Sequence, residues 1–179
     1  MSRIVLAAGA SAALHKSCDL ASKLAQAGHT VRTVLTPNAA KLIHPQLFEA
    51  LTGEPARSSE FGDDRRGGMD HIELSQWAEL FLVAPASADL VARLALGLAG
   101  DLPTTIALAL DPAVPKLLAP AMNPHMLSAP PIARHLETLT GDGWRLVSPG
   151  SGHMACGVEG RGRLAEPTEI VDLVAEVLG

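Results

Sequence analysis

Three side chains of this sequence stand where chemistry can be done, and the first is an amide between two prolines. Asn123 lies in the segment Pro120–Pro124, directly after an apolar run. Strand ends in an open α/β sheet face the ligand crevice, so an amide fixed there can bind a carboxylate through its NH₂ group. The alternative is an ordinary Asx turn after a strand, because asparagine favours such turns. Taken alone, the segment fits both interpretations equally.

The second side chain is an imidazole at a predicted helix start. His71 follows Asp70 and precedes Glu73, a spacing similar to a capping box, which predicts that the imidazole lies in the first helical turn. The positive end of the helix disfavours an imidazolium, so His71 is expected to be neutral and able to accept a proton. The alternative is a surface role. Of the other histidines, His125 and His153 are expected to line the site, and His15, His29, His44 and His135 to be exposed.

The third side chain is a thiol among glycines. Cys156 lies in a segment that can bend over a ligand, where a partly exposed thiol can deliver a proton. The alternative is a small filler beneath a loop. Cys18 falls on the apolar stripe of a predicted helix and is expected to be a small core residue. Neither cysteine belongs to a CxxC pair and no histidine pair has metal-ligand spacing, so neither a disulfide framework nor a metal site is predicted.

Short apolar runs alternate with helical patterns, which predicts βαβ units and a parallel sheet. The expected fold is α/β, a single Rossmann-like or flavodoxin-like domain over residues 1–179 with a parallel sheet flanked by helices. The polar stretch Thr52–Gly68 is expected to be a loop or flap. Predicted strands are Arg3–Ala8, Thr30–Leu35, Leu80–Ala84, Pro115–Ala119 and Arg145–Val147. Predicted helices are Ala12–Ala27, Pro37–Leu51 with a break near Pro45, Asp70–Ala78, Ala88–Leu98, Thr104–Leu110, His125–Thr138 and Thr168–Leu178.

Three of these strands end at residues suited to holding an anion. The first is expected to run directly into a helix through Gly9–Ser11, so that free backbone NH groups face the crevice. Thr36 and Ser87 offer hydroxyls at two further helix starts, although plain N-caps explain them equally well. The absence of a full GxGxxG motif favours a mononucleotide over a dinucleotide. The residues expected to bind this phosphate-bearing ligand are Gly9, Ala10, Ser11, Thr36, Ser87 and Ala88.

Composition narrows the class of protein. The chain has 47% hydrophobic residues, mostly because of Ala, Leu and Val, and a mean hydropathy of +0.22, so part of this surface is expected to cover subunit interfaces. No apolar run reaches about 18 residues and no signal peptide is apparent, which predicts a soluble, cytoplasmic protein with no membrane partner. A net charge of −5 without a basic cluster argues against nucleic acid as a partner.

The segments Met69–Leu74, Leu118–Leu127 and Ser151–Leu164, in this order and at these separations, closely resemble the flavin-dependent cysteine decarboxylases. The similarity runs from Ile4 to about Ile170. It is greatest to the phosphopantothenoylcysteine decarboxylases, including the amino-terminal half of the bifunctional bacterial enzymes of coenzyme A biosynthesis. Two departures are Leu127, where the family usually has an aromatic residue, and Arg161, where it usually has proline.

The resemblance implies the cofactor, the substrate and the assembly. It implies FMN, a homotrimer that is sometimes assembled into a dodecamer, and a small cysteine-terminated substrate. That substrate is 4′-phospho-N-pantothenoylcysteine, which is decarboxylated to 4′-phosphopantetheine. His71 would take a proton while the substrate thiol is oxidised to a thioaldehyde, and Asn123 would hold the carboxylate. After CO₂ loss, Cys156 as acid would help convert the enethiolate to the saturated thiol. Met122, Ala155 and Gly157 are expected to contact the substrate.

Three alternatives remain within reach of the sequence. A peptidyl-cysteine decarboxylase of a peptide-modifying pathway stops at the enethiol, and Cys156 argues against it. A flavin prenyltransferase shares the fold but is not expected to combine His71, Asn123 and Cys156. A non-enzymatic flavin-binding regulator is expected to have lost His71 or Cys156.

Overall fold

A parallel sheet of six strands forms the centre of this computed structural model, which describes residues 1–61, 69–153, 157 and 159–179. All neighbouring strands are parallel, which confirms the predicted α/β fold of the Rossmann-like or flavodoxin-like kind. In spatial order the strands are β3 (Ala56–Arg57), β2 (Thr30–Leu35), β1 (Arg3–Ala8), β4 (Leu80–Ala86), β5 (Lys116–Pro120) and β6 (Trp144–Leu146).

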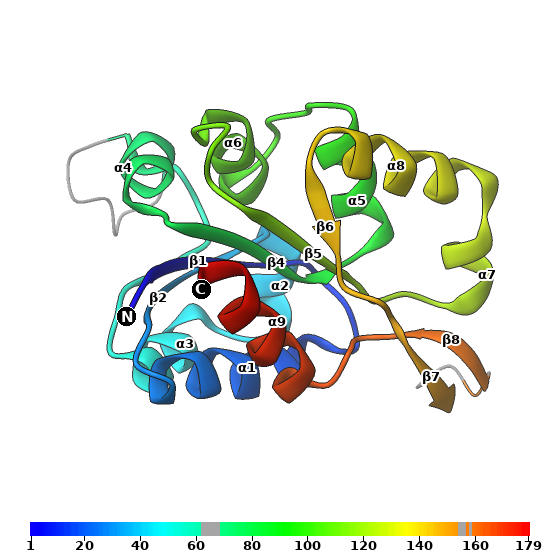
Figure 1. Cartoon of the computed structure of the whole chain (residues 1–179), viewed down its shortest axis with the longest axis horizontal. Coiled ribbons are helices and arrows are strands. Elements are labelled where there is room, and N and C mark those ends of the chain that lie inside the picture. The colour runs from blue at the N-terminus through cyan, green and yellow to red at the C-terminus, as the bar shows by residue number, and fades with distance from the viewer. Residues whose placement is uncertain (62–68, 154–156, 158) are drawn as a thin grey trace.

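Helices cover both faces of this sheet. They are α1 (Leu14–Gln26), α2 (Pro37–Leu42), α3 (Pro45–Thr52), α4 (Asp70–Trp77), α5 (Ala88–Ala95), α6 (Leu102–Ala109), α7 (Pro124–Ser128), α8 (Pro130–Gly141) and α9 (Pro167–Leu178). Figure 1 shows α1, α3 and α9 on one face and α4, α5, α6 and α8 on the other. The fold is therefore a three-layer sandwich, as right-handed crossovers between parallel strands require. Among the described residues, no helix is long and apolar enough to span a bilayer.

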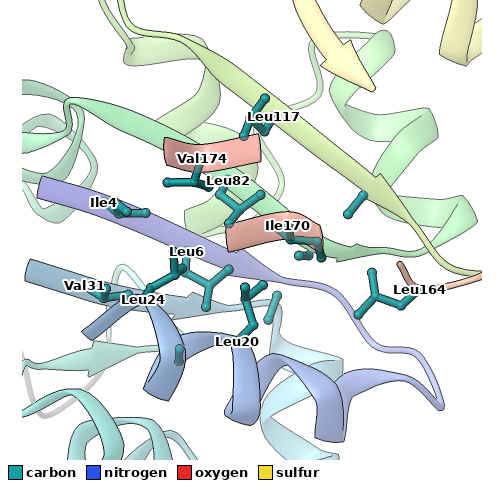
Figure 2. Packing of buried hydrophobic residues seen from close by; sticks show 14 of the residues in the cluster. Ile4, Leu6, Leu20, Leu24, Val31, Leu82, Leu117, Leu164, Ile170 and Val174 are labelled. Atoms are coloured by element: carbon teal, nitrogen blue, oxygen red, sulfur yellow. The ribbon is translucent and has the colours of Figure 1, made fainter. Parts of the chain in front are cut away.

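Alternating residues of the central strand divide the core into two layers. Ile4 and Leu6 of β1 face one layer, where Leu20 of α1 and Ile170 of α9 complete the packing (Figure 2). Val5 faces the opposite layer. Burying each such aliphatic side chain stabilises the fold by about 1.5–3 kcal/mol relative to leaving it exposed. Strands covered on both faces read as continuous apolar runs, which is why the central ones were predictable.

Two segments predicted as loops contain strands. β3 lies inside the stretch Thr52–Gly68, where it pairs with β2 for only two residues. The glycine-rich segment after residue 150 forms an antiparallel hairpin of β7 (Gly150–His153) and β8 (Glu159–Arg163). Neither segment has apolar alternation, because β3 is too short and the hairpin is built largely of glycine and polar residues. Hydrophobic periodicity therefore carried no signal for them.

Several predicted helix boundaries are also wrong; α5, for example, ends at Ala95 rather than at Leu98. The stretch His125–Thr138 contains α7 and α8, separated at Ala129, whose backbone is extended because the residue before a proline disfavours the helical region. The first helix begins at Leu14 rather than at Ala12. The break near Pro45 is confirmed, since α2 and α3 are separate helices.

Candidate active site

A cavity of about 420 Å³ opens at the carboxyl ends of β1, β4 and β5. Strands β1 to β3 form one half of the sheet and β4 to β6 the other, and the two halves meet where β1 lies beside β4. Open α/β sheets bind ligands at such topological switch points. The volume is within the range of about 300–1,000 Å³ that is usual for small-molecule sites. Its wall is largely apolar and includes Met122 and Leu164. Alanines leave room for a flat ligand, among them Ala10, Ala12, Ala88 and Ala121.

The end of β1 is held tightly against its neighbours. The Gly9 NH donates to the Pro85 carbonyl at 2.9 Å, and a Cβ at Gly9 would lie 2.8 Å from that oxygen, so only glycine fits. Ser11 Oγ donates to the Ala121 carbonyl and accepts from the Ala13 NH, both at 3.3 Å. Ser11 therefore joins the β1 loop to the end of β5. The predicted direct entry into a helix is wrong, because Ala13 is the N-cap residue.

A helix start faces the cavity at the end of β4. Ser87 caps α5 by accepting a hydrogen bond from the Leu90 NH at 3.3 Å, and both Ser87 and Ala88 line the cavity. The positive end of α5 therefore favours an anion there. Thr36 caps α2 in the same way, by accepting from the Ala39 NH, but it is not among the described residues that line the cavity. Of the residues predicted to bind the phosphate-bearing ligand, Ala10, Ser11, Ser87 and Ala88 therefore line one cavity of a single chain.

The amide of Asn123 lines the same cavity. Its Oδ1 accepts a 2.8 Å hydrogen bond from the His125 NH and caps α7. The residue is therefore an Asx turn and a cavity residue at once, so the two interpretations of the sequence do not compete. With Oδ1 bound to backbone, the orientation of the amide is fixed. Met122, which precedes it, is buried and also lines the cavity, as expected.

The β7–β8 hairpin forms one wall of the cavity by packing closely on this segment. The Met122 NH donates to the Gly162 carbonyl at 3.0 Å, and a Cβ at Gly162 would overlap the Met122 carbonyl. A Cβ at Gly160 would lie 2.9 Å from Pro124 Cγ. The glycines of β8 are therefore required by close approach, whereas the sequence had suggested that they serve flexibility.

Basic side chains stand at the rim. Lys16 Nζ donates a 2.7 Å hydrogen bond to Glu166 Oε1, which lowers the pKa of the Glu166 carboxyl. Arg163 lines the cavity beside them. His153 lines it as expected, whereas His15, expected to be merely exposed, lines it as well. His125, expected at the site, is exposed and is not among the described residues of the wall.

His71 lies in the first turn of α4, as predicted, but without a capping box. Met69 is the N-cap residue and makes no side-chain cap. Asp70 is buried in an ion pair with Arg57 at 3.0 Å instead. His71 Nδ1 lies 3.2 Å from Glu60 Oε1. Sequence reasoning missed Glu60 and Arg57, because both lie in a stretch without periodicity.

The imidazole and the amide lie far apart within one chain. Figure 1 shows α4 at one end of the molecule and α7 with the hairpin at the other. His71 is not among the described residues that line the cavity, whereas Asn123 is. A single chain therefore does not assemble the two residues that the sequence analysis placed in one active site.

The predicted acid and one substrate contact, Cys156 and Ala155, lie outside the described residues. Gly157 is described: it is exposed and has a φ of 78°, a backbone conformation that favours glycine. Cys18 is partly buried against the core, and burial raises the pKa of its thiol. The described residues contain no group of three His, Cys, Asp or Glu side chains that could hold a metal ion.

Comparison with known proteins identifies the family. The flavoprotein family model matches residues 1–179. The coenzyme A biosynthesis bifunctional protein CoaBC of Bacillus subtilis is 38% identical over 95% of this chain, which spans only 41% of that relative's length. A solved PPC decarboxylase mutant complexed with pantothenoylaminoethenethiol is 31% identical, with a TM-score of 0.88 and coverage of 99% of this chain and 98% of the other. The FMN-binding protein AtHal3 is 32% identical, with a TM-score of 0.84 and coverage of 98% and 96%. The chain therefore belongs to the flavoprotein family, in the group that contains PPC decarboxylase, as its three motifs indicated.

Proposed function

We propose that the chain is an FMN-dependent decarboxylase of 4′-phospho-N-pantothenoylcysteine, acting in coenzyme A biosynthesis. One observation carries the proposal: a fixed amide, Asn123, lines an apolar cavity at the switch point of a flavoprotein fold. An amide NH₂ donor in a largely apolar site binds a carboxylate well, because water does not compete for it. The similarity to CoaBC and to a PPC decarboxylase supports this substrate.

The residues of the cavity fit FMN. Its small apolar side chains leave space for a flat ring system. At Gly9 and Gly162 a Cβ would clash with the backbone carbonyls of Pro85 and Met122, so glycine allows the close packing of the segments around the cavity. Ser11, Ser87 and the start of α5 offer hydroxyl and NH groups for the phosphate. When bound, FMN would supply a reversible two-electron acceptor.

The chain's own residues would bind the substrate and move its protons. Asn123 holds the carboxylate, so that the carbon–carbon bond to this group keeps its orientation while it breaks. His71 accepts the thiol proton as the cysteine is oxidised to a thioaldehyde, which provides the electron sink that a plain cysteine lacks. Cys156 would supply the proton to the enethiolate, which becomes the saturated thiol when the two electrons stored in the cofactor are returned as well. Met122, Ala155 and Gly157 contact the substrate.

The experiment that tests this function is mass spectrometry of the product from purified, FMN-loaded protein. Phosphopantothenoylcysteine is expected to lose CO₂ and yield phosphopantetheine. A peptide with a carboxyl-terminal cysteine, offered in parallel, tests the alternative of a peptide-modifying enzyme, whose product retains the enethiol. Formation of a prenylated flavin would indicate a transferase, and no change in either substrate would contradict a decarboxylase.

We further propose that the active site is shared between copies of this chain, in a homotrimer or a multiple of it in the cytoplasm. His71 is remote from the cavity of its own chain. Two apolar side chains close to it in sequence, Phe61 and Met69, are 82% and 63% exposed, as expected of a surface that another subunit covers. Sedimentation of the flavin-loaded protein is expected to give a trimer or a multiple of three, and an active monomer would contradict the proposal.

A further inference from the structure

The carboxylate beside His71 has no role in the function proposed above. Glu60 precedes α4 in the chain and is largely buried, with 17% of its side chain exposed, against 25% for His71. Its Oε1 lies 3.2 Å from His71 Nδ1, and among the described residues it meets no donor in full hydrogen-bond geometry. This oxygen is thus withdrawn from water and lies close to the imidazole.

The other carboxylates around the start of α4 already have arginine partners. Asp70 pairs with Arg57 at 3.0 Å, and Glu73 pairs with Arg32 at 3.0 Å and with Arg57 at 3.5 Å. Glu60, by contrast, forms no ion pair with a lysine or arginine in the part of the chain that the structure describes. Of the acidic groups near His71, Glu60 is therefore the one whose charge acts on the imidazole.

A neutral imidazole carries its proton on one nitrogen only, and a carboxylate selects which. A lone pair on Nδ1 would be repelled by the negative oxygen of Glu60 at 3.2 Å, whereas an NH there would be attracted to it. A buried acceptor is costly to leave without a donor, which strengthens the selection. With Nδ1 protonated, the lone pair is on Nε2, the nitrogen on the opposite side of the ring.

We propose that Glu60 is a positioning residue that fixes the tautomer and ring orientation of His71, so that Nε2 acts as the base. This rests on the proposed function. The carboxylate also stabilises the imidazolium that forms once Nε2 has taken the substrate proton, as a carboxylate does behind any base histidine. Glu60 itself touches neither substrate nor cofactor.

The first test reads the tautomer directly and needs no catalysis. In protein labelled with ¹⁵N-histidine, at about pH 8.5 where ordinary histidines are neutral, His71 is assigned by its loss in His71→Asn. Its proton is expected on Nδ1 in the wild type and in Glu60→Gln, whose amide oxygen still accepts. In Glu60→Ala it is expected to move largely to Nε2. Glu54→Gln is the matched control, because Glu54 pairs with Arg32 and does not contact His71. A wild-type His71 protonated on Nε2, or a Glu60→Ala protein with an unchanged tautomer, would overturn the proposal.

The second test measures flavin reduction by substrate in a single turnover. The limiting rate in Glu60→Ala is expected to fall by about tenfold, less than the 10²- to 10⁴-fold that loss of a general base costs. The substrate concentration for half-maximal rate is expected to stay unchanged, because Glu60 does not bind substrate. Glu60→Gln is expected to recover part of the rate. An equal limiting rate in the wild type and Glu60→Ala refutes the positioning role. A wild type that substrate does not reduce refutes the decarboxylase, and the tautomer measurement then still decides about Glu60.

Discussion

Two inactive variants of this chain are expected to restore activity when they are mixed. His71→Asn removes the proposed base and Asn123→Ala removes the proposed ligand of the carboxylate, so each variant alone is expected to lose at least about 10²-fold in rate. In one chain α4, which carries His71, and α7, which Asn123 caps, lie at opposite ends of the molecule (Figure 1), and of these two residues only Asn123 is among the described residues that line the cavity. If each site takes His71 from one subunit and Asn123 from its neighbour, a mixed assembly contains some sites with both residues intact.

The size of the effect follows from counting. In a cyclic assembly formed at random from equal amounts of the two variants, a site is intact when its imidazole comes from the Asn123→Ala chain and its amide from the His71→Asn chain. Each condition is met half of the time, so about one quarter of the sites are expected to be active. A site built within one chain predicts no recovery at all. Mixing wild type with the double variant distinguishes the same models, with about one quarter active for the shared site and about one half for the single-chain site.

The assay is CO₂ release from phosphopantothenoylcysteine by co-expressed, differently tagged chains purified through both tags. This purification keeps only mixed assemblies, and in a mixed trimer the expected active fraction for complementary variants rises from about one quarter to about one third of the sites. Flavin content measured on the same samples controls for loss of cofactor. Activity no greater than that of the two separate variants, in assemblies shown by mass to be mixed, would refute the shared site.

Three further outcomes are expected. Gly162→Ala should destabilise the protein by about 1–3 kcal/mol in chemical denaturation and weaken flavin binding, because its φ is 146° and its Cβ would overlap the Met122 carbonyl. Gly141→Ala, with nothing within 4 Å of its Cβ, is the control and should not be destabilised. Cys156→Ser should still release CO₂ but give a product lighter by two hydrogens, and a saturated product at the normal rate would exclude Cys156 as the acid. Cys18→Ser should cost no more than about 1–3 kcal/mol for the partly buried hydroxyl and leave the product unchanged.

The sheet was predictable because its strands are buried on both faces. Arg3–Ala8 and Thr30–Leu35 match β1 and β2 to the residue. β1 is a continuous apolar run after Arg3, as a buried parallel strand usually is, whereas β2 was readable from its Thr and Val residues, which favour strands. The helix starts at Pro37 and Ala88 were equally readable, because Thr36 and Ser87 are caps of standard chemistry. These features depend only on neighbours in the sequence.

The parts that escaped prediction depend on contacts between distant segments. Glycine in β8 indicates flexibility when read alone, yet Gly162 is glycine because the backbone of Met122, forty residues earlier, passes too close for a side chain. Ser11 resembles a helix cap, but its hydroxyl donates to Ala121. In both cases the residue type has a common local explanation in the sequence, but in the structure a tertiary contact accounts for it.

The position of His71 extends this lesson beyond the single chain. Its residue type and place in a first helical turn were legible, because they are local. Its distance from Asn123 could not be predicted, because the order of the motifs in the sequence does not show whether one copy of the chain or two copies supply the residues of one site. The His71 imidazole is flanked by exposed Met69 and has a carboxylate near its Nδ1 atom, which fits the proposal that it acts on a ligand held by a neighbouring chain. If the proposed shared site is right, the cavity and the base are brought together only by association, so subunit contact and catalysis should be lost together when that surface is changed.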